Sequence, residues 1–462
     1  MKRRTTIAVN SLVLPILICI ILLIGPVSQA NAGWEQADKI LSRIKAPTFP
    51  DRDFNITDYG AVGDGKTSCT EAINKVILAA NKAGGGRVVV PAGSFLTGAI
   101  YLKSNVNLYV SEGAVVKFSN DPNAYLPAVY TRWEGVECMN YSPLIYAYKE
   151  KNIAITGKGT LDGQGKSWWK WKRISERRED RTKLLNQGRD GVPVKERQYG
   201  GKSLSPNMIE PYKCQNILIE GIKIKNGPFW HIHPVLSENI TVRNVRVDGS
   251  GPNNDGCDPE SCKDVLIEGC YFNNGDDCIA IKSGRNNDAR RVNVPSENII
   301  VRNCEMKEGH AGVAIGSEIT GGARNIFVEN CVMDDPNQDR ALRLKTNSVR
   351  GGFIENVYVR NITIGQVKES VLLIDFFYQD IEKGNYKPVV KNINLENVTS
   401  KKSKYALFLR GFDNAPIRDV RLKNCTLDNV EGPDVISNVK NLVMENVKIN
   451  GKLASTAGAD SD

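Results

Sequence analysis

A short segment with alternating apolar residues recurs along the chain, and this repeat constrains the fold more than any other feature. The copy Asn216-Ile-Leu-Ile-Glu-Gly-Ile222 returns eight times at intervals of 22 to 36 residues. The other copies start at Asn239, Asp264, Asn298, Asn325, Asn356, Asn392, Asp419 and Asn441, and an earlier segment at Asn152 resembles them. The alternation has the period of a half-buried strand and not the 3.6-residue period of a helix. Short strands repeated at a bounded interval predict a β-solenoid of parallel coils about 4.8 Å apart.

Two residue types hold fixed positions in this repeat. A shared bend position, where side-chain amides can hydrogen-bond along the stack, is occupied by Asn244, Asn303, Asn330, Asn361, Asn397, Asn424 and Asn446. One inward position is occupied by Cys270, Cys304, Cys331 and Cys425, which we interpret as small buried hydrophobic residues. This placement argues against a disulfide framework, although disulfides involving Cys257, Cys262 and Cys278, in turn-like sequence, stay open.

The ends of the solenoid need covers. Residues 68–83 predict an N-terminal cap helix, with a capping box from Ser68 and Glu71, an apolar face, and Gly84 at its end. Residues 33–51 are expected to be an N-terminal lead-in and residues 52–452 a single β-solenoid domain. The small, polar residues 453–462 predict a flexible tail.

The first 32 residues have the pattern of a signal peptide. Lys2, Arg3 and Arg4 precede an apolar run over 12–24, and residues 30–32 (Ala-Asn-Ala) offer a cleavage site. The run is short for a bilayer span, although an uncleaved anchor is the alternative. We therefore expect a secreted or periplasmic protein that has no membrane attachment after the leader is cleaved.

The positive charge is concentrated in one segment. The formal net charge is +9, and residues 166–202 contain twelve Lys or Arg against five acidic residues. Such a patch indicates an anionic partner. Outside the cytoplasm an acidic polysaccharide is a better candidate than nucleic acid, which we exclude. A solvated insertion that happens to be basic is the alternative.

Residues 60–67 match the phosphate-binding loop pattern G-x-x-x-x-G-K-T and precede the expected cap helix. The pattern requires a buried central strand before it and a doubly wound sheet after it. The preceding segment is short and a solenoid follows, so we interpret these glycines as turn residues and not as a nucleotide site.

Acidic residues recur about one coil apart. Asp255 follows Asn253 in one turn, and Asp276 and Asp277 lie 21 and 22 residues later. We expect these three carboxylates to be neighbours on one face, where mutual repulsion raises at least one pKa toward that of a general acid.

The next coils add a histidine and two cations to that face. His310 follows in Gly-His-Ala-Gly, and Arg343 and Lys345 project together one coil further on, as a site for a carboxylate ligand. Acidic turns that bind Ca²⁺ or stay solvated are the alternative. His231 and His233 share a face without a third metal ligand, which favours a packing role.

The ordered motifs Asn-x-Asp, Gly-Asp-Asp, Gly-His-x-Gly and Arg-x-Lys resemble those of glycoside hydrolase family 28, the polygalacturonases. The resemblance covers about residues 52–450, includes the opening at 57–67, and implies a right-handed parallel β-helix. It implies that Asp276 is the general acid, that Asp255 and Asp277 activate water, and that His310 supports the protonation state of the acid. It also implies that Arg343 and Lys345 bind the substrate carboxylate, with Lys282 and Asn253 as further contacts. Two departures from the family pattern are Asn254 and Ala311.

The resemblance implies an exported hydrolase that cleaves α-1,4-galacturonosyl bonds of pectin with inversion, without a metal or organic cofactor. We expect the acid and base to stand about 6.5–9.5 Å apart. We also expect a monomer whose basic insertion, with Trp168, Trp169 and Trp171 stacking on sugars, closes one end of the cleft and favours exo-action. The alternatives are a rhamnogalacturonan or xylogalacturonan hydrolase, a pectate lyase, and a non-catalytic pectin-binding solenoid.

Overall fold

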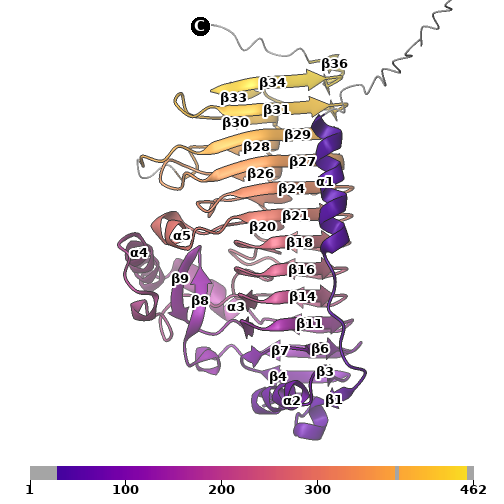
Figure 1. Ribbon diagram of the computed structural model, residues 1–462, viewed down its shortest axis with the longest axis vertical. Coiled ribbons are helices and arrows are strands. Elements are labelled where there is room, and N and C mark those ends of the chain that lie inside the picture. Colours follow the sequence, from indigo (N-terminus) through magenta and orange to yellow (C-terminus); the bar gives the residue numbers. More distant parts are fainter. Residues whose placement is uncertain (1–28, 380–383, 455–462) are drawn as a thin grey trace, which may run out of the picture.

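The computed structural model describes residues 29–379 and 384–454. Over this part of the chain the strands stack into a right-handed parallel β-helix, and its coils succeed one another along the long axis (Figure 1). The predicted fold class is therefore confirmed. Each coil contributes strands to some or all of three faces.

The first face contains β1 (Asp53–Asn55), β3 (Gly86–Val90), β6 (Val106–Val110), β11 (Lys151–Gly157), β14 (Gln215–Glu220), β16 (Glu238–Arg243), β18 (Lys263–Glu268), β21 (Ser296–Arg302), β24 (Ala323–Glu329), β27 (Phe353–Ile364), β29 (Val389–Ser400), β31 (Ile417–Lys423) and β34 (Val439–Glu445). The second face contains β2 (Asp64–Ser68), β4 (Gly93–Thr97), β7 (Ala114–Phe118), β12 (Thr160–Asp162), β15 (Lys223–Lys225), β17 (Arg246–Gly249), β19 (Tyr271–Asn274), β22 (Glu305–Met306), β25 (Val332–Met333), β32 (Thr426–Leu427), β35 (Lys448–Ile449) and the antiparallel β36 (Lys452–Leu453). The third face contains β5 (Ile100–Tyr101), β10 (Ile145–Tyr148), β13 (Ile209–Tyr212), β20 (Ile279–Ile281), β23 (Val313–Ile315), β26 (Arg340–Lys345), β28 (Ser370–Asp375), β30 (Tyr405–Arg410) and β33 (Val435–Ser437).

Every copy of the sequence repeat forms a strand of the first face. The copies pair in parallel and in register, so that Ile217, Ile240 and Val265 lie directly above one another and are fully buried. Alternate residues point into the tube because side chains alternate across a strand. The apolar positions of the repeat therefore build one continuous core.

Asparagine side chains form ladders along the outside of this core. At the predicted bend position, Asn361 Nδ2 donates to Asn330 Oδ1 and Asn397 Nδ2 donates to Asn361 Oδ1, both at 3.0 Å. A second ladder, which the sequence did not predict, runs through the first residue of each repeat, as from Asn239 to Asn216 at 2.7 Å. Both positions have a left-handed backbone, with φ near 55°, which asparagine tolerates better than most residues.

The lead-in contains a helix that covers the first face, which the sequence also did not predict. Helix α1 (Gln29–Arg43) runs across several coils of the solenoid (Figure 1). Its residues Trp34 and Ile40 pack on Phe327 and Tyr358, which are outward-facing aromatic residues of the sheet. The helix includes residues 30–32 of the expected cleavage site, whereas residues 1–28 of the expected leader lie outside the described residues.

Helix α2 (Thr70–Lys82) covers the N-terminal end of the solenoid, as predicted (Figure 1). The predicted capping box is wrong, because the N-cap residue is Cys69 and no side chain caps the helix there. Ser68 instead shares a hydrogen bond with the Thr70 hydroxyl at 3.1 Å. The expected tail, residues 455–462, lies outside the described residues.

The loop that resembles a phosphate-binding loop is filled by its own acidic residue. Asp64 Oδ1 accepts hydrogen bonds from the backbone N–H groups of Lys66 and Thr67, each at 2.8 Å. A phosphate would need such backbone donors. The geometry supports the interpretation of this segment as a turn.

Irregular segments rise beside the third face. They comprise the hairpin of β8 (Val129–Trp133) and β9 (Val136–Asn140), helices α3 (Lys166–Trp169), α4 (Ser175–Arg189) and α5 (Asn286–Val292), and the 3₁₀ helices Pro122–Tyr125, Lys170–Arg173 and Val194–Glu196. A further 3₁₀ helix, Ile56–Tyr59, lies at the N-terminal end beside α2. The ten cysteines in the described chain are all buried and free, which leaves the possible disulfides unformed. Among the described helices, none is both long and apolar enough to cross a bilayer.

Candidate active site

The carboxylates lie at the start of the third face on successive coils. Asp255 precedes Cys257, which bridges to Ile279 one coil on, and the Gly256 N–H donates to the Asp277 carbonyl at 3.0 Å. The His310 N–H in turn donates to the Asp276 carbonyl at 3.3 Å. Parallel stacking thus converts a sequence separation of one coil into direct adjacency.

The predicted cluster of three carboxylates is present. One oxygen each from Asp255, Asp276 and Asp277 lies within 4.8 Å of the others. This is closer than the 6.5–9.5 Å expected between an acid and a base, so the separation alone does not identify an inverting enzyme. Burial and the charge of Asp276 raise the pKa of Asp255 to about 7. The raised pKa thus falls on a carboxylate expected to activate water and not on Asp276, the expected acid.

Asp276 forms a pair with His310. The His310 Nδ1 lies 2.8 Å from Asp276 Oδ1, and the imidazole is half exposed to the cleft. Burial raises the pKa of Asp276, but the hydrogen bond and charge of His310 outweigh it and hold the pKa below its usual range. The same hydrogen bond raises the pKa of His310. Both shifts favour a protonated histidine beside an ionised carboxylate.

Asp277 is held ionised by the two predicted cations. Lys345 Nζ lies 2.5 Å from Asp277 Oδ2, and Arg343 Nη1 lies 3.5 Å from Asp277 Oδ1. Burial opposes the charge of Asp277, yet Lys345 and then Arg343 lower its pKa. Both cations also lie over the ring of Tyr378, at 5.3 and 5.4 Å from its centroid.

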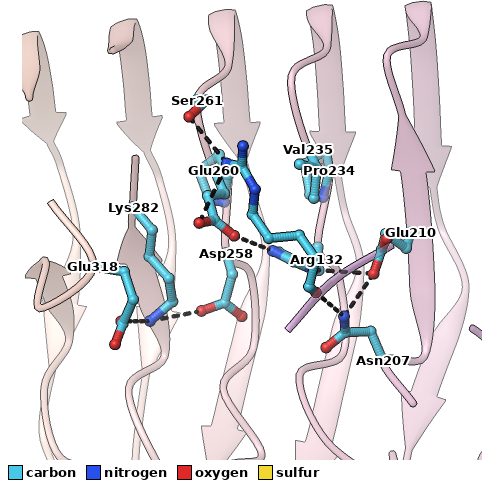
Figure 2. A network of polar contacts seen from close by, with 12 residues as sticks. Arg132, Asn207, Glu210, Pro234, Val235, Asp258, Glu260, Ser261, Lys282 and Glu318 are labelled. Carbon is cyan, nitrogen blue, oxygen red and sulfur yellow. Dashed lines mark hydrogen bonds and ion pairs between the residues drawn. The ribbon is translucent and has the colours of Figure 1, made fainter. Parts of the chain in front are cut away.

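Lys282 lies among the carboxylates and is 3% exposed, as little as Asp255 and slightly less than Lys345. Its Nζ lies 3.5 Å from Asp255. It also lies 3.4 Å from Asp258 and 3.5 Å from Glu318 (Figure 2). These three ion pairs favour a positioning role for Lys282, and the expected substrate contact stays a prediction. Asp258 is fully buried, and burial followed by the charge of Asp255 raises its pKa well above the usual range.

The Asn253 turn brings a residue of the insertion to the site. Lys172 Nζ forms a hydrogen bond with Asn253 Oδ1, and Asp276 is among the charges that act on this lysine. Asn254, one of the two departures, fixes the turn because its Nδ2 donates to the Gly227 and Phe229 carbonyls at 2.9 and 3.0 Å. The other, Ala311, is fully buried against Ala280 and Ala314.

The insertion differs from the prediction in how it uses its tryptophans. Trp168 is 2% exposed and packs on Tyr125, Tyr141 and Trp171, so it supports the insertion and does not stack on a sugar. Trp169 is half-buried, and its Nε1 donates to the Gly227 carbonyl at 2.9 Å. Aromatic side chains contribute large apolar surfaces to a core, and the sequence does not show which aromatic residues of an irregular insertion are buried.

His231 and His233, which precede the carboxylates by one coil, are both buried, as predicted. His231 Nε2 accepts the Gly227 N–H and its Nδ1 donates to the Asp255 carbonyl at 2.9 Å. Burial lowers the pKa of His231 to about 4, so it is neutral at pH 7. His233 lies between Glu210 and Glu260, at 3.3 and 2.7 Å.

A buried polar network surrounds the glutamates that contact His233 (Figure 2). Arg132, from the hairpin, lies 3.4 Å from Glu260 and donates to Ser261 at 3.2 Å, and Asn207 donates to Glu210 at 2.6 Å. Buried charges and polar groups need such partners because desolvation is costly. Arg132, Asp258, Glu318 and Tyr378 were not predicted as part of the site, whereas Lys172 belongs to the predicted basic insertion. Only Asp258 carried a signal, as the second acid of Asp255-Gly-Cys-Asp258.

The site is suited to acid–base chemistry more than to holding a cation. Ca²⁺ takes six to eight oxygen ligands. Here Lys282, Arg343 and Lys345 approach the same carboxylates and supply the positive charge themselves. The arrangement offers one carboxylate–histidine pair that carries a proton and one carboxylate that stays ionised, within reach of a common reacting atom.

The chain is similar to known carbohydrate-active proteins. The model of glycosyl hydrolases family 28 matches residues 190–450, and a model described as rhamnogalacturonase A/epimerase, pectate lyase-like, matches residues 54–117. An exopolygalacturonase from Thermotoga maritima superposes with a TM-score of 0.88 at 44% identity, over 91% of this chain and 96% of that chain. A probable polygalacturonase of Vitis vinifera is 28% identical over 90% of this chain and 82% of its own length. An exo-poly-alpha-D-galacturonosidase of Dickeya chrysanthemi is 29% identical over 71% of this chain and 57% of its own length. The four motifs, the solenoid and these similarities agree, and the chain belongs to glycosyl hydrolases family 28.

Proposed function

We propose that this glycoside hydrolase cleaves α-1,4-galacturonosyl bonds of polygalacturonate, releasing sugars from a chain end by an acid–base mechanism with inversion. The observation that carries the proposal is the cluster of three carboxylates, with one acid paired to His310 and another paired to Arg343 and Lys345. The relatives whose names state a polygalacturonase activity support the substrate class.

The proposed acid is Asp276, acting with His310. The pair holds one proton, and the 2.8 Å hydrogen bond lets it pass from His310 Nδ1 through Asp276 to the glycosidic oxygen as the bond to the anomeric carbon breaks. The leaving sugar then carries the proton as a hydroxyl. Shielding of the pair by bound substrate favours the neutral carboxylic acid over the charged pair.

The proposed bases are Asp255 and Asp277. A water held between them and the anomeric carbon loses a proton to a carboxylate as its oxygen attacks. The site resets when that carboxylate releases the proton to solvent and the Asp276–His310 pair takes one up, so that no net proton is consumed. Asp277 is kept ionised by Lys345, whereas Asp255 ionises near pH 7. Arg343 and Lys345 are the proposed ligands of the substrate carboxylate at the scissile bond, where two cations suit one anion.

Exo-action is supported by the insertion and by the named exopolygalacturonase. Residues 166–202 fold into α3, α4 and short 3₁₀ helices, and Lys172 reaches the turn that carries Asp255. A wall at one end of the cleft admits a chain terminus and excludes a continuing polymer. Deleting this insertion should broaden the sizes of the released products, and an unchanged distribution would contradict exo-action through this wall.

The test of the activity is product analysis with de-esterified polygalacturonate. Saturated monogalacturonate appearing from the start supports the proposal. Unsaturated uronate would make the protein a lyase, and binding without cleavage would make it a pectin-binding solenoid. Cleavage of rhamnogalacturonan or xylogalacturonan alone would change the substrate within the same class.

The leader-like pattern of residues 1–32 supports export, and an exported hydrolase would meet pectin outside the cytoplasm. Determination of the N-terminal sequence of the protein recovered from its native compartment tests this. A start near residue 33 is the expected result, and an intact Met1 would contradict cleavage.

A further inference from the structure

A second cationic pocket lies beside the active site and has no role in the chemistry proposed above. It has a volume of about 230 Å³ and lies between α4, the start of α5 and the loop that follows β26. No acidic residue of the described chain lines it. The lining includes four arginines and several amides, among them Arg181, Arg189, Arg285, Asn286, Asn347 and Arg350. At about 30 Å³ per water, it has room for a group of roughly seven waters.

The charges around the pocket do not balance. Arg181 and Arg285 share Glu134, at 2.7 and 3.1 Å, and Arg189 pairs with Asp190 at 2.7 Å. Arg350 is only 4% exposed, and no acidic group of the described residues forms an ion pair with it. The charge of Glu318 acts on it, but Glu318 is paired with Lys282 and Arg285. A buried guanidinium without an anion of its own is costly, so the pocket favours one further negative charge.

Arg350 is nevertheless held in a fixed position. Its Nε donates to the Ser317 carbonyl at 3.2 Å and its Nη1 donates to Asn286 Oδ1 at 2.7 Å, both neutral acceptors. Asn347 fixes the loop by accepting the Arg350 N–H at 2.9 Å. Burial, and then the charge of Arg285, lower the pKa of Arg350 to about 9, and a bound anion would reverse that shift.

The pocket is connected to the catalytic residues by ion pairs. Arg285 lies 3.5 Å from Glu318, Glu318 lies 3.5 Å from Lys282, and Lys282 lies 3.5 Å from Asp255. The insertion contributes one wall through α4, so the pocket depends on the segment that we assign to the closed end of the cleft.

We propose that this pocket is an additional subsite that binds the carboxylate of a galacturonate unit other than the one held by Arg343 and Lys345. The inference rests on the proposed function and extends it, because it makes Arg350 a determinant of chain recognition. A free carboxylate at this unit supplies the missing charge, whereas a methyl ester does not. The enzyme should therefore prefer unesterified chains at this position.

The test measures binding, so that it does not depend on turnover. Trigalacturonate is titrated by calorimetry into protein inactivated by Asp276→Asn, alone and combined with Arg350→Gln. A second variant, Asn186→Trp, fills the pocket from the exposed surface of α4 and leaves the buried arginines in place. Arg178→Gln and Lys183→Trp, on exposed positions of α4 that do not line the pocket, are the matched controls.

Loss of a charge-assisted hydrogen bond should weaken binding about tenfold or more in both pocket variants. The controls should bind within about twofold of the parent, because surface charges contribute little. Fully methyl-esterified trimer should bind weakly and should not respond to Arg350→Gln. Unchanged affinity in Asn186→Trp would overturn the inference even if Arg350→Gln perturbs folding. If the pocket variants bind trigalacturonate more weakly than the parent but the wild-type protein does not cleave it, the proposed function is refuted and the pocket remains a binding site.

Discussion

Lys282 offers a quantitative test of how the carboxylates are tuned. The change Lys282→Met removes an ammonium that lies 3.5 Å from Asp255 and 3.4 Å from Asp258. A charge pair at this distance interacts by about 4–5 kcal/mol at an effective dielectric constant of about 20, which is an upper bound. The loss of a close charged contact typically costs about 1.5–3 kcal/mol, which corresponds to about 1–2 pKa units.

The sign of the effect follows from the charge. Lys282 favours ionised Asp255, whose pKa is already about 7 because of burial and the charge of Asp276. Without the lysine the pKa of Asp255 rises to about 8–9. A base must be ionised to accept a proton from water, so the acid-side limb of kcat/KM should move to higher pH by about 1–2 units.

The assay is the initial rate of release of reducing sugar from trigalacturonate as a function of pH. Lys282→Arg should restore much of the profile, and Lys263→Met, which removes an exposed lysine paired with Glu297, should leave it unchanged. Because breaking a buried pair costs about 3–5 kcal/mol, a lower melting temperature should accompany the shift. A limb that stays in place, or moves to lower pH, in folded Lys282→Met would refute this account of Asp255.

Three further predictions test separate parts of the structure. Asp276→Asn should lower kcat about 10²–10⁴-fold while calorimetry shows trigalacturonate binding retained, and near-normal turnover would place the acid elsewhere. Trp34→Ala removes the contact of α1 with Phe327, and denaturant unfolding should show a loss of about 3 kcal/mol without a change in kcat, whereas unchanged stability would mean that α1 does not brace the solenoid. Treatment with EDTA should leave the activity unchanged, since three cations of the chain neutralise the carboxylates, and a loss restored by Ca²⁺ would favour a lyase.

The sequence predicted the solenoid because its repeat is strict at the positions that become the core. Ile217, Ile240 and Val265 are equivalent in the sequence and are stacked in the structure. The same stacking made the active-site cluster predictable, since Asp255 and Asp277 are one coil apart and the Gly256 N–H hydrogen-bonds to the Asp277 carbonyl. Periodic features of a solenoid can be predicted from the sequence because residues that lie side by side in space are separated by one repeat along the chain.

Non-periodic features were not predictable in this way. The docking of α1 on Phe327 joins residues about 290 positions apart, and no repeat relates them. The ion pairs of Lys282 with Asp258 and Glu318 were not predictable either, because a lysine that follows three apolar residues gives no sign of its partners. Trp168 was expected to stack on a sugar because its position in a basic insertion gives no sign that its side chain is buried. Ser68 and Glu71 have capping-box spacing, but the helix begins at Thr70, after Cys69.

The measurement that tests the central claim most directly is a proton NMR time course of the protein with de-esterified polygalacturonate. The account predicts saturated galacturonate from the earliest time points, with the new reducing end appearing first as the β anomer from an α-linked chain. Because the carboxylates are closer together than usual for inversion, the anomer is decisive. Initial release of the α anomer would show retention and would contradict the assignment of Asp255 and Asp277 as bases that activate water.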